Sequence, residues 1–68
     1  MQIQVNGESR TLAEGSTIAD LLAELGLTSR GVAVEVNRDV VPRGRHAEHV
    51  LAEGDEVEVV RAIGGGTA

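Results

Sequence analysis

Apolar and polar residues alternate along three stretches of the chain. Residues 1–5, 31–36 and 56–60 place apolar side chains at every second position. Successive side chains of a β-strand point to opposite faces, so each stretch would have one apolar face to bury and one polar face in solvent. The pattern therefore predicts three half-buried strands.

Two shorter strands are predicted beside turns. Asn6-Gly7 is a strong hairpin signal, because both central residues of a type I′ turn need positive φ. Residues 8–12 are therefore expected to return antiparallel to the first strand. Residues 40–41 are expected to form a short strand after a polar turn. Pro42 ends this strand or keeps it at a sheet edge, because proline has no backbone N–H.

Apolar residues at helical spacing predict one helix over residues 17–25. They lie on one side of such a helix: Ile18, Leu21, Leu22 and Leu25. Thr17 is a good N-cap, and Asp20 three positions later completes a weaker form of the capping box. Gly26 is suited to the left-handed conformation that ends a helix. The apolar stripe is expected to cover the sheet, because a domain this small has no other core to build.

The predicted elements follow the order hairpin, helix, strand, short strand and strand. One helix can pack across one face of a mixed sheet of about five strands, which places the chain in the α+β class. This order matches the β-grasp arrangement, in which the first and last strands are central parallel neighbours. We expect residues 1–63 to form this domain, with a short helical turn or loop around residues 45–48. Residues 64–68 would form a flexible C-terminal tail.

Composition narrows the classes of function. A chain of 68 residues corresponds to one small domain, and without cysteine it has neither disulfides nor thiolate metal sites. With no aromatic residue and a formal net charge of −5, it is unsuited to stack nucleic-acid bases or to approach a phosphate backbone. The charge favours a protein partner with a basic docking surface. No apolar run approaches the roughly 18 residues of a membrane span, so a cytoplasmic protein without a membrane partner is expected.

Side-chain chemistry offers no convincing catalytic site. His46 and His49 stand on either side of Glu48, but no further ligand is nearby, so we interpret all three as exposed surface residues. The serine and threonine hydroxyls lack the strand–turn–helix setting of a nucleophile elbow, and the histidines lie far from them along the chain. Glutamates that alternate with valine, such as Glu35, are interpreted as the solvated face of the sheet. No catalytic residue, bound cofactor or metal site is therefore predicted.

The run Gly64-Gly65-Gly66 is the remaining chemical feature. Glycine has no side chain to pack and loses the most backbone freedom on ordering, so this run is unsuited to a core. No helix follows it, so it is not a phosphate-binding loop. A bare backbone can instead thread a narrow channel and present a terminal carboxylate inside another protein. An ATP-dependent partner could activate that carboxylate as an acyl-adenylate; a frayed chain end is the alternative.

The chain resembles the ThiS family, which comprises ubiquitin-like sulfur carriers of thiamin biosynthesis. The residues that carry the likeness are 1–3 with Asn6, the predicted helix, the Asn-x-x-Val-Val-Pro-Arg run at 37–43, residues 54–60 and the glycine pair after Ile63. The run at 37–43 is the most specific of these, because related carriers of molybdopterin synthesis usually lack it.

The resemblance implies a function for the tail. An E1-like enzyme (ThiF type) would use ATP to adenylate Gly66, the adenylate would become a thiocarboxylate, and the sulfur would pass to thiazole synthase (ThiG type). Gly64 and Gly65 would thread the partner's active site. The chain would be a protein cosubstrate and not an enzyme, and a monomer when free. Family members commonly end at the second glycine, so we expect a C-terminal peptidase to remove Thr67 and Ala68, unless these two do not belong to the natural chain.

Partners are expected to dock on one face of the last strand, at Glu58, Val60 and Ala62. For each residue alone, ordinary solvated surface is the simpler interpretation. Two other functions stay open. One is sulfur transfer in another pathway, such as cysteine or molybdopterin synthesis. The other is an interaction module with an idle tail, which would work through the outward residues Gln2, Gln4, Glu35 and Glu58.

Overall fold

The computed structural model describes residues 1–61, which contain five strands, one α-helix and one 3₁₀ turn. In chain order these are β1 (Gln2–Val5), β2 (Glu8–Thr11), α1 (Ile18–Glu24), β3 (Val32–Val36), β4 (Asp39–Val41), η1 (Arg43–Arg45) and β5 (Glu56–Arg61). The predicted order and the α+β class are confirmed. The 3₁₀ turn begins two residues earlier than the predicted helical turn, and a hydrogen bond from the His49 N–H to the Arg45 carbonyl continues it.

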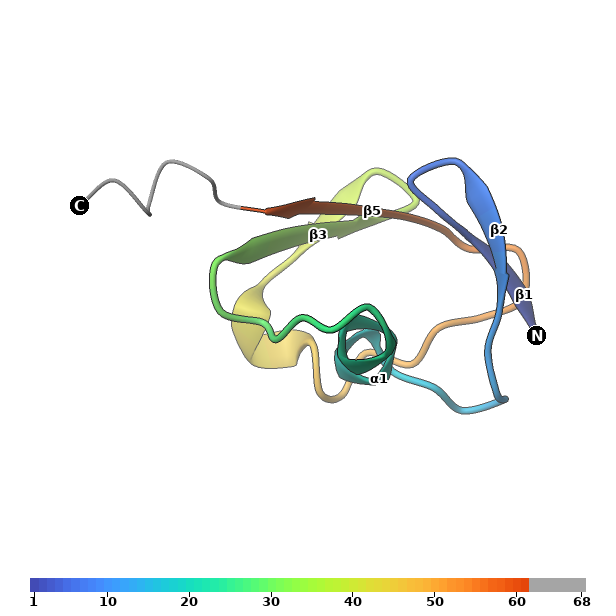
Figure 1. The fold of residues 1–68 in the computed structure, drawn as a ribbon, viewed down its shortest axis with the longest axis horizontal. Helices are drawn as coiled ribbons and strands as arrows, with labels where there is room; N and C mark the ends of the chain where they lie inside the picture. Colours follow the sequence, from blue (N-terminus) through green and yellow to red (C-terminus); the bar gives the residue numbers. More distant parts are fainter. Residues whose placement is uncertain (62–68) are drawn as a thin grey trace.

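The strands form one mixed sheet in the order β2-β1-β5-β3-β4 (Figure 1). β1 and β5 are parallel neighbours, with Gln4 beside Glu56 and Val5 beside Val57. The other neighbouring pairs are antiparallel. The first and last strands therefore lie together inside the sheet, which confirms the β-grasp prediction. The start of β5 lies between β1 and β3, and its last residues pair with β3.

Two tight turns set the hairpins of the sheet. Asn6 and Gly7 have φ of 51° and 84°, and Asn37 and Arg38 have φ of 51° and 74°. Positive φ at both central positions gives the turn twist that matches the strands on either side. Asparagine tolerates this region well, whereas Arg38 is held there without that advantage.

Helix α1 begins and ends as its sequence predicts. The Thr17 hydroxyl accepts a hydrogen bond from the Asp20 N–H at 3.2 Å, and the Asp20 carboxylate accepts one from the Thr17 N–H at 2.9 Å. Two of the free donors at the helix start are thus satisfied reciprocally. Gly26 follows the helix with φ of 77°, the left-handed conformation expected there.

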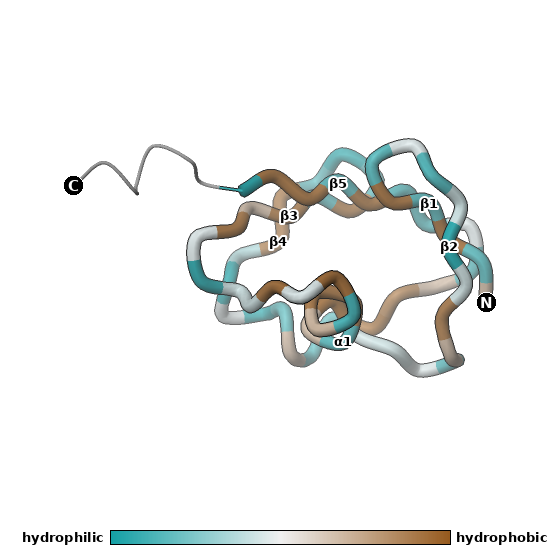
Figure 2. Tube along the Cα trace, in the orientation of Figure 1, coloured by the Kyte–Doolittle hydropathy of each residue, from teal (hydrophilic) through white to brown (hydrophobic). Residues whose placement is uncertain are grey.

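The core lies between α1 and one face of the sheet, and both layers contain apolar segments (Figures 1 and 2). It is built from aliphatic side chains only: Ile3, Val5, Leu12, Ile18, Leu21, Leu22, Val34, Val36, Val41, Leu51, Val57 and Val59. The alternation predicted for β1, β3 and β5 is confirmed, because every second residue of these strands is buried or nearly so. The opposite face of the sheet is exposed and mostly polar, with Val40 and Val60 as its large exposed apolar residues among residues 1–61.

Candidate functional site

The predicted carrier tail continues from β5. Gly64, Gly65, Gly66, Thr67 and Ala68 lie outside the described residues, as does Ala62. β5 runs to Arg61, the last residue described. The candidate site therefore consists of the side chains that form hydrogen bonds to β5 and of the exposed face of this strand.

Asn6 holds β5 where the backbone of β1 no longer reaches it. Its side-chain oxygen accepts a hydrogen bond from the Val59 N–H at 2.8 Å, and its amide nitrogen donates to the Val59 carbonyl at 3.2 Å. β1 pairs with β5 only as far as Val5 and Val57, so this side chain takes the place of the next residue of a strand. Both backbone groups of Val59 are satisfied, as partly buried backbone groups need to be.

Asn37 makes a similar attachment at the start of β5. Its side-chain oxygen accepts a hydrogen bond from the Glu56 N–H at 3.1 Å, and its amide nitrogen donates to the Asp55 carboxylate at 3.0 Å. The Asn37 N–H also donates to the Glu56 carbonyl at 2.7 Å. β5 is thus attached near both ends by asparagines from the two tight turns. The backbone of β5 is therefore held in place up to Val59.

The outward face of β5 offers the surface that the sequence predicted for docking. Glu58 and Val60 are both exposed, and Val60 keeps 59 % of its surface open. In the register with β3, Ala33 lies beside Val60 and Glu35 beside Glu58. Carboxylates next to exposed aliphatic groups can pair with a basic, partly apolar surface. Gln2, Gln4 and Glu35, the outward residues of the alternative interaction module, are exposed as well.

The interpretation of His46 as a surface residue is wrong. It is 1 % exposed and lies in the core, with its Nε2 3.0 Å from the Val41 carbonyl and its Nδ1 2.8 Å from the Ser29 hydroxyl. A carbonyl only accepts, so Nε2 carries a proton, and in the neutral ring Nδ1 accepts from Ser29. The ring satisfies its polar atoms internally and joins β4 to the loop after α1. No periodicity around residue 46 signals this burial.

The Ser29–His46 contact is the one pairing of a hydroxyl with an imidazole that the hydrogen bonds of the described chain contain. Because the ring is buried, a substrate cannot reach it. His49 is half-buried and Glu48 exposed, so the three residues of the 46–49 segment do not share one environment. Within residues 1–61 no group of three histidine, cysteine or acidic side chains is arranged to hold a metal ion. In the same residues, no helix has the length and apolar character needed to span a membrane.

Comparison with known proteins places this geometry in a family. The ThiS family model matches residues 3–66. The sulfur carrier protein ThiS of Escherichia coli is 35 % identical over 66 residues, which cover 97 % of this chain and 100 % of that protein. A thiazole synthase of Paramagnetospirillum magneticum is 43 % identical over 67 residues, 98 % of this chain. The chain spans about a fifth (21 %) of the length of that synthase.

The fold agrees with the sequence matches. The crystal structure of the thiamine biosynthesis protein ThiS from Geobacter metallireducens superposes with a TM-score of 0.79 at 31 % identity, covering 90 % of this chain and 93 % of that one. The β-grasp sheet, the departure of the chain from its central strand and the match through Gly66 agree with one another. The chain therefore belongs to the ThiS family of sulfur carrier proteins.

Proposed function

We propose that this chain carries sulfur for thiazole formation in thiamin biosynthesis, with the carboxyl group of Gly66 as the carrier group. The observation that supports this most directly is the family match, which extends from residue 3 to Gly66 and stops there. Thr67 and Ala68 would be removed by a C-terminal peptidase, because the side chain of Ala68 would not fit a channel shaped for glycine. The chain acts as a protein substrate and not as a catalyst.

The reaction is supplied by partners. The Gly66 carboxylate would attack the α-phosphate of ATP on an E1-like enzyme of the ThiF type, and pyrophosphate would leave. Hydrosulfide from the sulfur donor would then attack the acyl carbonyl and lose its proton, AMP would leave with the electrons of the C–O bond, and a thiocarboxylate would remain. A thiazole synthase of the ThiG type would receive the sulfur. Gly64 and Gly65 would thread the active site, because bare backbone occupies the least space.

The attachment of β5 supports this function physically. A carrier must present its end at a constant distance from its docking surface, since misplacement of a reacting group slows a reaction strongly. Asn6 and Asn37 fix the backbone of β5 near its two ends. Glu58 and Val60 lie on the exposed face of the same strand and would contact the partners there, with Ala62 following them. The cytoplasm, where ATP is available, is the proposed compartment.

Intact-mass spectrometry tests the proposal. The chain ending at Gly66 is incubated with the activating enzyme of the same organism, ATP and a sulfur donor, and replacement of one oxygen by sulfur should add about 16 Da. A chain ending at Gly65 is the matched control and should stay unmodified. If no C-terminal form gains mass, the proposed carrier function is wrong. The mass of the protein from its natural host tests the trimming, because a sulfurated species that still carries Thr67 and Ala68 would contradict it.

Deletion of residues 64–68 separates the carrier from an interaction module with an idle tail. The carrier loses all sulfur transfer, whereas a module that works through Gln2, Gln4, Glu35 and Glu58 would keep its binding. The pathway is tested by the accepting enzyme: thiazole synthase should take the sulfur, and enzymes of cysteine or molybdopterin synthesis should not.

A further inference from the structure

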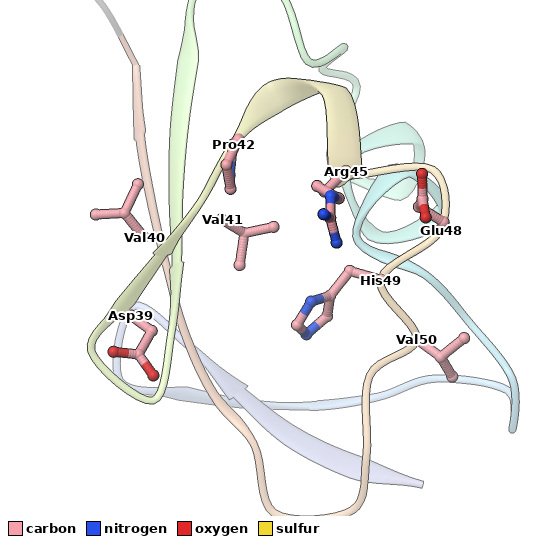
Figure 3. A pocket seen from close by; sticks show the side chains of 8 residues that line it. All are labelled: Asp39, Val40, Val41, Pro42, Arg45, Glu48, His49 and Val50. Carbon is pink, nitrogen blue, oxygen red and sulfur yellow. The ribbon is translucent and has the colours of Figure 1, made fainter.

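The run at 37–43 includes residues that the proposed carrier chemistry does not use, among them Val40, Val41 and Pro42. Part of it lines a hollow of about 650 Å³ between β4 and the segment that follows η1 (Figure 3). Val40, Val41 and Pro42 lie on one side of the hollow, and Arg45, His49 and Val50 on the other. We call this hollow the β4 groove.

The β4 groove combines apolar surface with polar groups that point inward. The side chains of Val41, Arg45 and His49 converge in its middle, whereas Glu48 is turned away from them (Figure 3). Val50 at one end of the groove keeps 57 % of its surface exposed. Aliphatic surface left in contact with water beside a positive charge is suited to a protein partner.

The backbone of β4 adds a second feature of a docking site. β4 is the last strand of the sheet and pairs with β3 only, so its other edge is not covered by a strand among residues 1–61. Such an edge can accept an extended segment from another protein, which combines backbone hydrogen bonds with side-chain contacts. The strand is short and Pro42 follows it, so a partner segment would make few backbone bonds and depend on the groove.

The charged residues that line the groove are Arg45, Asp39 and Glu48. Arg45 lies in the middle of the groove, and Glu48 is turned away from it (Figure 3). Arg45 is exposed, and in the described part of the chain it has no carboxylate within 4 Å. An unpaired arginine in a groove is complementary to a carboxylate of a partner.

The groove lies within reach of a protein that holds the tail. Val41 is paired with Val34, and Val34 with Val59, so the three lie in one row across β4, β3 and β5. Two strand spacings separate Val41 from Val59 by about 10 Å. Val59 is two residues before Arg61, where β5 ends. One partner can therefore contact the groove and the tail together.

We propose that the β4 groove is a second docking site, which receives an extended segment of thiazole synthase that places an aliphatic side chain against Val41 and Val50 and one carboxylate against Arg45. The proposal rests on the proposed function for the identity of the partner. Thiazole synthase is favoured because a synthase that contains a segment 43 % identical to nearly this whole chain has the carrier unit and the enzyme in one polypeptide. Attachment at two places lengthens the time that the tail stays in the synthase, since the second contact forms at a high effective concentration.

Binding of the full chain to thiazole synthase of the same organism, measured by titration calorimetry, tests the groove. Arg45→Glu reverses the charge in its middle and should weaken binding at least about tenfold. Val50→Ser removes aliphatic surface at one end and should weaken binding about three- to tenfold. Arg38→Glu makes the same charge change in the preceding turn, outside the groove, and should change affinity less than about threefold. Circular dichroism confirms that each variant is folded.

The results have distinct meanings. If Arg45→Glu and Arg38→Glu lose affinity equally, the net charge of the chain and not the groove determines binding, and the proposal is wrong. It is also wrong if Arg45→Glu and Val50→Ser leave the affinity unchanged. Slowed adenylation by the activating enzyme with unchanged binding to the synthase would assign the groove to the wrong partner and overturn it as well. The mass change of the unmodified sequence is measured independently. Sulfuration with no effect of the groove variants therefore refutes the groove alone, whereas groove-dependent binding without sulfuration refutes the carrier function alone.

Discussion

Replacement of Asn6 tests how the end of β5 is held. Asn6 does two things in the structure: it occupies a left-handed turn position with φ of 51°, and its side chain makes both hydrogen bonds to the backbone of Val59, 53 positions later. Asn6→Ala removes the bonds and places a Cβ-bearing residue without a polar side chain at positive φ. Asn6→Gly removes the bonds but keeps the turn free of strain.

The two variants separate the free energy of the hydrogen bonds from the cost of the left-handed backbone conformation. A net contribution of about 0.5–1.5 kcal/mol for each hydrogen bond gives a loss of about 1–3 kcal/mol for Asn6→Gly. The left-handed conformation costs alanine about another 1 kcal/mol, so Asn6→Ala should lose about 2–4 kcal/mol. A domain of 68 residues has a free energy of unfolding of only about 3–10 kcal/mol, so these losses are large. They correspond to a fall of about 4–8 °C in Tm for each kcal/mol.

Urea unfolding followed by far-ultraviolet circular dichroism measures the effect, because the chain has no aromatic residue for fluorescence. The midpoint should fall in both variants with little change in the slope, since the folded surface is nearly the same. Amide exchange of Val59 should accelerate more than that of Ile3. A loss below about 0.5 kcal/mol in Asn6→Gly would show that the bonds to Val59 do not hold β5, and the reasoning would be refuted.

Asn6→Asp adds a pH dependence with a definite sign. The introduced carboxylate can still accept from the Val59 N–H but faces the Val59 carbonyl where the amide had donated at 3.2 Å. Two acceptors repel, so folding raises the pKa of this carboxyl above its usual value of about 3.9. The folded state then binds more protons, and the stability deficit relative to Asn6 should appear as pH rises above about 4 and shrink below it. A deficit that does not depend on pH would contradict this account.

Three further substitutions test other parts of the fold, each by urea unfolding. His46→Ala should lower the free energy of unfolding by about 2–4 kcal/mol, because a buried ring and two hydrogen bonds disappear. His49→Ala should lower it by less than about 1 kcal/mol. Equal losses in the two variants would contradict the burial of His46. Thr17→Ala should cost about 1 kcal/mol through loss of the N-cap, and Thr17→Ser should restore most of it. Gly26→Ala should cost about 1 kcal/mol because φ is 77° there; an unchanged midpoint would mean that the helix end can rearrange.

The candidate site was predicted from sequence in part. Glu58 and Val60 are exposed on the strand that leads to the tail, as the alternation of 56–60 indicates. The roles of Gly66 and of the residues around it stay predictions, since those residues lie outside the described part. The groove beside β4 was not predicted, because its two walls come from segments whose separation in space depends on how η1 packs.

Local signals determined most of the fold. Alternation specifies a half-buried strand wherever it occurs, because adjacent side chains of a strand point to opposite faces. Asn6-Gly7 favours its turn, and Thr17 with Asp20 starts α1, through backbone sterics and hydrogen bonds within a few residues. These interactions are complete within a short segment, so the sequence alone was sufficient to predict them.

Only the tertiary structure decided how distant polar groups are used. The sequence predicts Asn6 as a turn residue, but in the structure its side chain also continues the pairing of β1 with β5. The sequence predicts His46 as a surface residue, but the structure buries it. Burial is possible because the Val41 carbonyl and the Ser29 hydroxyl satisfy both ring nitrogens. The physical reason is the same in both cases. The cost of burying a polar group depends on whether a partner is present, and that partner is brought into place by the closing of the whole chain and not by neighbouring residues.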